Sequence, residues 1–135
     1  MAGALLSEQG LEPEKIQKIV HCIATHRFRD GNIPESLEAK VVFDADKLDS
    51  IGAVGIGRAF LFAGENGSRL HVEDQKPYDA ESYGPEDTAY HEYLVKLRKV
   101  KDRLLTQTGQ QLALERHQFM VEFFERLNKE AKGLI

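Results

Sequence analysis

The strongest constraint on the fold is the spacing of apolar residues, which recur every three or four positions along most of the chain. Ile16, Ile19, Val20 and Ile23 follow this spacing and give a helix one apolar face. Two longer stretches near the C-terminus, residues 90–105 and 112–131, follow it as well. Because this period is that of the α-helix, the chain is predicted to be an all-α bundle of five or six helices.

Residues that begin and end helices divide this pattern. Gly10 is expected to end a first short helix, and Pro13 suits the first position of the next one. Ser36 is a cap for a third helix, Gly52 separates it from a fourth, and Thr108-Gly109 separates the last two. The predicted helices cover residues 2–9, 13–26, 36–51, 53–63, 90–105 and 112–131, with a loop over 27–34 and a long connection over 64–86.

Composition excludes several classes of protein. The chain has 135 residues with 18 basic and 22 acidic side chains, a balance that fits one domain over 1–135 and argues against bulk nucleic-acid binding. No apolar run approaches the roughly 20 residues that span a membrane, and the N-terminus does not resemble a signal peptide. The single cysteine, Cys22, rules out an internal disulfide and is expected to be a buried thiol. We therefore expect a cytoplasmic protein.

Three carboxylates stand out because they fall within six residues of an otherwise apolar helix: Asp44, Asp46 and Asp49. Asp is a poor helix former, so this density requires an explanation. On a helix Asp46 and Asp49 share a face, while Asp44 points elsewhere. One interpretation is a solvated acidic stripe beside Lys40 and Lys47. The other is a site for a hard divalent cation such as Mg²⁺, Mn²⁺ or Fe²⁺, which carboxylate oxygens suit.

The histidines near the first loop are the second candidate. His21 and His26 lie about 140° apart around a regular helix, so they do not bind one metal without a bend between them. His21 is more typical of a packed or surface histidine. His26 sits at the predicted helix end, where the loop presents it to an anion together with Arg27 and Arg29.

Other familiar motifs are absent or misleading. The stretch Gly52–Gly57 contains three glycines, but it has neither the GxGxxG spacing after a strand nor a GK[ST] phosphate loop. Its small residues instead suggest close helix packing. No GxSxG elbow occurs, and Lys101 belongs to a group of basic side chains that mostly decorate helix surfaces.

Taken as one string, Asp44 to Ala53 resembles the corresponding string of the HD superfamily of metal-dependent phosphohydrolases. The resemblance extends to His21–Phe28, Gly55–Phe60 and Leu97–Met120. It implies an HD-type helical bundle that acts on a nucleotide or another phosphate ester with Mn, Mg or Fe. It implies that Asp46 binds the metal, that His26 and less surely His21 bind a second metal or the phosphate, and that Arg27, Lys47 and Lys101 steady phosphate charge.

The sequence departs from that family in one respect. The family also binds metal through a histidine and a His-Asp doublet, and none of the five histidines here is followed by aspartate. The resemblance is therefore to the C-terminal portion of an HD domain, incomplete at the N-terminus, with one of four expected ligands. We expect little activity from this chain alone, and a homodimer or a missing N-terminal partner segment covering its apolar faces. The alternative is a non-catalytic helical interaction module.

Overall fold

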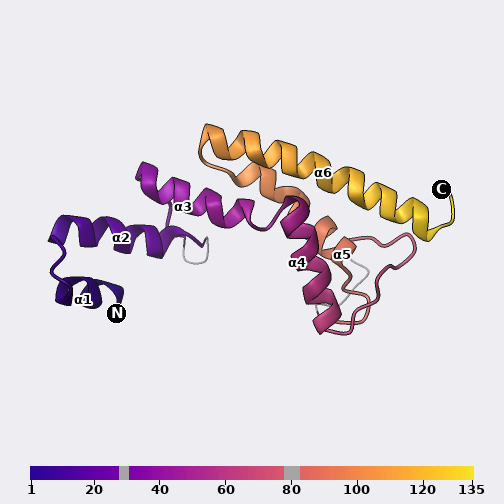
Figure 1. The fold of residues 1–135 in the computed structure, drawn as a ribbon, viewed down its shortest axis with the longest axis horizontal. Helices are drawn as coiled ribbons and strands as arrows, with labels where there is room; N and C mark the ends of the chain where they lie inside the picture. Colours follow the sequence, from indigo (N-terminus) through magenta and orange to yellow (C-terminus); the bar gives the residue numbers. More distant parts are fainter. Residues whose placement is uncertain (28–30, 78–82) are drawn as a thin grey trace. The chain divides into compact units, whose positions relative to one another are not determined.

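The computed structural model describes residues 1–27, 31–77 and 83–135. Within those residues it contains six α-helices and one 3-10 helix, with no β-strand, so the all-α prediction is confirmed. The helices are α1 (Ala2–Glu8), α2 (Pro13–Thr25), α3 (Leu37–Leu48), α4 (Gly52–Glu65), α5 (Ala89–Val95), η1 (Leu97–Arg103) and α6 (Gln107–Ala131) (Figure 1). The chain divides into two compact units, Met1–Asp46 and Lys47–Ile135.

The boundaries of the first helices follow the local signals. Gly10, at φ +75°, ends α1, and Pro13 occupies the start of α2. The Ser36 hydroxyl accepts a hydrogen bond from the Ala39 amide at 3.1 Å and so caps α3 as predicted. In the first unit, α1 packs on α2, yet α1 buries no residue and Thr25 is the buried residue of α2.

The second unit holds the main apolar core. Helix α6 packs along α4 and η1, and α5 contacts both α4 and η1 (Figure 1). The buried cluster comprises Ile51, Ile56, Ala59, Ala89, Tyr93, Leu94, Leu97, Val100, Leu104, Ala113, Met120 and Phe124. Four aromatic rings meet around Phe124, whose ring centroid lies 4.7 Å from that of Tyr93. This cluster fixes the positions of α4 and α5, which carry several of the polar residues considered below.

Two predictions about the C-terminal region were wrong. The expected helix over 90–105 is interrupted at Lys96, so α5 ends at Val95 and η1 continues in 3-10 geometry. Leu97 and Val100 are buried three residues apart, a spacing that matches one 3-10 turn. Thr108-Gly109 lies inside the first turn of α6, because Thr106 is the cap: its hydroxyl accepts from the Gly109 amide at 3.0 Å.

Candidate functional site

The three aspartates of the string occupy different environments. Asp44 is 3% exposed and lies on the buried side of α3 with Ala39 and Phe43. Asp46 is exposed. Asp49 follows the helix and forms an exposed ion pair with Arg58 of α4. A carboxylate is rarely buried without a specific role, so Asp44 is the member that the structure singles out.

The resemblance to the HD superfamily implied Asp46, and not Asp44, as the metal ligand. No sequence signal selects Asp44: on a regular helix it lies about 100° from Phe43 and about 140° from Ala39, so the helical period does not predict its burial. The exposed Asp46 stays a prediction as a metal ligand.

Hydrogen bonds distinguish the two histidines of the first unit. The Nε2 of His21 lies 3.2 Å from the backbone amide of Glu35 and accepts its proton. In the neutral ring Nδ1 then carries the hydrogen, which leaves no lone pair for a metal. The Nδ1 of His26 lies 2.6 Å from the carbonyl oxygen of Ile23 and must donate to it. Its Nε2 then carries the lone pair, the arrangement common among metal-binding histidines.

The remaining predicted residues are spread over both units. Arg27 is exposed in the first unit, and Arg29 lies outside the described residues. Lys47 and Lys101 belong to the second unit, and the Lys101 ammonium pairs with Asp102 at 2.7 Å. Cys22 is half-buried, so the prediction of a buried thiol was wrong. Within residues 1–27, 31–77 and 83–135, no group of three or more His, Cys, Asp and Glu side chains is placed to hold a metal ion. The described residues do not fit a complete metal site.

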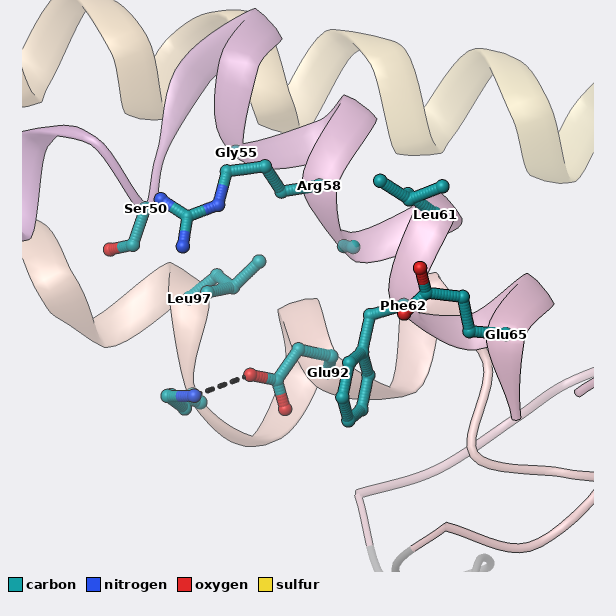
Figure 2. Close-up of a pocket in the computed structure, with 10 residues that line it drawn as sticks. Ser50, Gly55, Arg58, Leu61, Phe62, Glu65, Glu92 and Leu97 are labelled. Atoms are coloured by element: carbon teal, nitrogen blue, oxygen red, sulfur yellow. Dashed lines mark hydrogen bonds and ion pairs between the residues drawn. The ribbon is translucent and has the colours of Figure 1, made fainter.

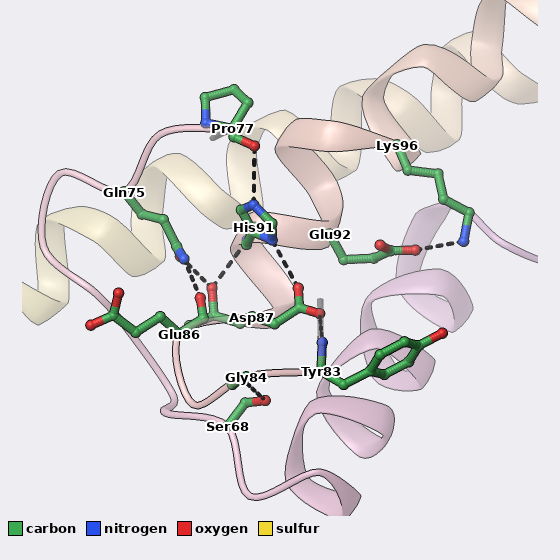
Figure 3. A network of polar contacts seen from close by, with 11 residues as sticks. Ser68, Gln75, Pro77, Tyr83, Gly84, Glu86, Asp87, His91, Glu92 and Lys96 are labelled. Atoms are coloured by element: carbon green, nitrogen blue, oxygen red, sulfur yellow. Dashed lines mark hydrogen bonds and ion pairs between the residues drawn. The ribbon is translucent and has the colours of Figure 1, made fainter. Parts of the chain in front are cut away.

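A polar network that the sequence did not reveal holds the connection before α5. His91 is buried at 5% exposure, with Nδ1 2.8 Å from an Asp87 carboxylate oxygen and Nε2 3.1 Å from the Pro77 carbonyl (Figure 3). The other Asp87 oxygen accepts the Tyr83 amide at 2.8 Å. Both ring nitrogens face hydrogen-bond acceptors, one a carboxylate oxygen and the other a backbone carbonyl. No local motif announces this site, since its members are up to 14 residues apart.

Beside this network lies a cleft between α4 and the α5–η1 segment, with a volume of about 310 Å³. Its lining includes four apolar side chains, Ala59, Leu61, Phe62 and Leu97, and four charged ones, Arg58, Glu65, Glu92 and Lys96. Figure 2 shows Arg58, Phe62, Glu65 and Glu92 around it. Such a volume is at the lower end of the range for small-molecule sites.

Comparisons with known proteins agree with this architecture. No family model matches the chain. The uncharacterized protein YpgQ of Bacillus subtilis is 42% identical over 129 residues, which cover 93% of this chain and 57% of YpgQ. The crystal structure of B. subtilis YpgQ in complex with ADP has a TM-score of 0.75 at 37% identity, covering 99% of this chain and 64% of that one.

A second solved structure, an HD-superfamily hydrolase from Bacillus thuringiensis, has a TM-score of 0.77 at 32% identity over 96% of this chain and 60% of that one. The chain thus spans less than two thirds of the length of these relatives. Among the helices of the described residues, none is both long and apolar enough to cross a membrane. These similarities support an HD-superfamily-like helical fold for this chain.

Proposed function

We propose that this chain is the aspartate-bearing part of a metal-dependent phosphohydrolase of the HD superfamily, acting on a nucleotide or another phosphate ester. The observation that carries the proposal is the carboxylate string at the end of α3, with Asp44 buried, in a chain 32% identical to an HD-superfamily hydrolase. The ADP complex of YpgQ, a relative at 37% identity, supports a nucleotide as the substrate class.

Asp44 and His26 are the residues on which we place the metal-binding role. Asp44 is buried on α3, so packing limits its motion, and His26 has its Nδ1 tied to a backbone carbonyl. Asp46, the choice from sequence, is the alternative carboxylate. His21 is the weaker histidine because its Nε2 already accepts the Glu35 amide. Arg27, Lys47 and Lys101 are proposed to steady phosphate charge.

The described residues supply too few ligands to hold a divalent ion tightly, so no catalytic step is assigned to them alone. We propose that the remaining ligands come from a further polypeptide segment of the kind that the longer relatives contain. For the isolated chain we expect turnover of phosphate esters well below about 1 per second, under the usual enzyme range, with Mn²⁺, Mg²⁺ or Co²⁺ present.

Manganese binding tests the assignment directly. Free Mn²⁺ is measured by electron paramagnetic resonance while the chain is titrated at millimolar concentration. We expect one weak site, weakened about tenfold by Asp44→Asn and by His26→Gln, the size of effect typical for metal-site residues. Asp49→Asn is the matched control in the same string, because Asp49 pairs with Arg58. Equal effects of Asp44→Asn and Asp49→Asn, or an effect of Asp46→Asn alone, would overturn the choice of Asp44.

The second candidate is a non-catalytic helical module that works by association. Exposed apolar side chains favour it, namely Val20 and Ile23 on α2 and Val54, Leu61 and Phe62 on α4. We propose a homodimer through one of these faces. Light scattering from 1 to 100 micromolar tests it, and a monomer throughout would count against it. Absence of any Mn²⁺ binding together with a stable dimer would favour this module over the hydrolase.

A further inference from the structure

In the cleft between α4 and α5, the side chains along one face of α4 change from basic through apolar to acidic. Arg58, Leu61, Phe62 and Glu65 all line it from α4 at positions i, i+3, i+4 and i+7. This spacing places them on one stripe of the helix, about 10 Å long from its basic to its acidic end. Figure 2 shows Arg58 extending toward Ser50, with Phe62 and Glu65 further along α4.

The apolar middle of this stripe is available to a ligand. Leu61 is 65% exposed and Phe62 is 50% exposed. The Phe62 ring makes an edge contact with Tyr83 at a centroid distance of 5.9 Å. The cleft also contains Gly55, Ala59 and Leu97, and an exposed aromatic ring in such a cleft is suited to stacking with a flat heteroaromatic group.

The two cations of the cleft are held by ion pairs that a phosphate can replace. Arg58 pairs with Asp49, and both side chains are about 60% exposed. Lys96 pairs with Glu92 at 2.7 Å and is 63% exposed. Exposed pairs of this kind contribute little net stability, whereas a guanidinium binds phosphate with two parallel hydrogen bonds.

We infer that this cleft binds a nucleoside monophosphate, with the phosphate on Arg58 and Lys96, the base stacked on Phe62, and N–H donors of the base facing Glu65. A ligand with an anionic end, a flat middle and hydrogen-bond donors at its far end matches the order basic, aromatic, acidic along α4. The choice of a nucleotide over other aromatic anions rests on the proposed function; the rest of the argument stands on the cleft itself.

The test is binding to the full chain in EDTA, so that no metal contributes. AMP, adenosine and ribose 5-phosphate are titrated by calorimetry and by NMR of the Leu61 methyl and Phe62 ring signals. We expect AMP to bind more tightly than either fragment and to shift both sets of signals. Arg58→Gln weakens AMP binding about tenfold, equivalent to about 1.4 kcal/mol, and leaves adenosine unchanged. Phe62→Leu weakens both AMP and adenosine.

Two further variants sharpen the result. Asp49→Asn removes the competitor for Arg58 and should strengthen AMP binding, an effect that misfolding would not produce. Arg126→Gln is the matched control, since Arg126 is an exposed arginine paired with Glu130 elsewhere in the same unit. The inference is overturned if AMP leaves the cleft signals unchanged, if Arg126→Gln acts like Arg58→Gln, or if ribose 5-phosphate binds as tightly as AMP.

This result is separate from that of the proposed function. If Asp44→Asn loses Mn²⁺ binding but the chain does not bind AMP in EDTA, the proposed nucleotide site in the cleft is wrong and the proposed hydrolase function stands. If the chain binds AMP in EDTA but Asp44→Asn does not change Mn²⁺ binding, the nucleotide site stands and the assignment of Asp44 as a metal ligand is wrong.

Discussion

Gly52, the residue that opens α4, is required for its backbone conformation. Its φ is +75°, and a Cβ there would lie 2.9 Å from Cγ of Arg116, whose guanidinium donates to the Leu48 carbonyl at the end of α3. Gly52→Ala is expected to lower the free energy of unfolding by at least about 1–2 kcal/mol, the cost of a left-handed residue with a side chain. The measurement is urea unfolding at 25 °C.

Gly57, five residues later, is the matched control. It lies within α4, and a Cβ there would meet no atom within 4 Å. Gly57→Ala should therefore raise the free energy of unfolding by about 0.5–1 kcal/mol, because alanine loses less conformational entropy in a helix. If both substitutions destabilise equally, the special role of Gly52 is wrong.

His117 on α6 is expected to make stability depend on pH. Burial lowers its pKa, the nearby Lys101 ammonium lowers it further, and Asp102 partly opposes them. Its Nδ1 is buried without a hydrogen-bond partner among the described residues. Between the unfolded value of about 6.5 and the lower folded pKa, the unfolded chain binds more protons, so stability falls as the pH drops through that window.

The check is the free energy of unfolding at pH 7.5 and pH 5.5. His117→Gln should show a smaller loss on acidification than the unmodified chain. Lys101→Met should also reduce the loss, but less, because burial is the larger cause. An unchanged pH dependence in His117→Gln would show that other groups dominate.

At the scale of elements, the connection between α4 and α5 depends on His91. Replacing it by phenylalanine keeps an aromatic ring but removes the ring nitrogens that contact one Asp87 carboxylate oxygen and the Pro77 carbonyl. His91→Phe should cost about 1–3 kcal/mol, the usual penalty for a buried unsatisfied group, and speed amide hydrogen exchange at Tyr83. Glu92→Gln, which only weakens an exposed pair with Lys96, should cost no more than about 0.5 kcal/mol.

At the scale of the whole molecule, the two units should differ in independent stability. Residues 47–135 contain the entire buried apolar cluster, whereas in residues 1–46 α1 buries nothing, α2 buries Thr25, and α3 buries Ala39, Phe43 and Asp44. We expect residues 47–135 expressed alone to unfold cooperatively on heating, followed by circular dichroism. Residues 1–46 alone should show little helix, because α1 and α2, of 7 and 13 residues, and an α3 cut short at Asp46 are all marginal without a larger core. A cooperative transition in residues 1–46 would contradict this.

The sequence alone determined the features that depend on neighbouring residues. The start of α2 at Pro13 and the cap of α3 at Ser36 follow from side chains next to the helix ends, and the all-α class follows from the apolar period. The aspartate string, and with it the resemblance to the HD superfamily, was visible for the same reason.

Only the tertiary structure decided what depends on residues far apart. It buried Asp44 and exposed Asp46, and it broke the predicted helix at Lys96. It also brought α4 and α5 together around one cleft and placed Pro77 and Asp87 on the two nitrogens of His91. Helical period fixes which residues share a face, but which face is buried, and against what, is set by packing between segments that the period does not relate.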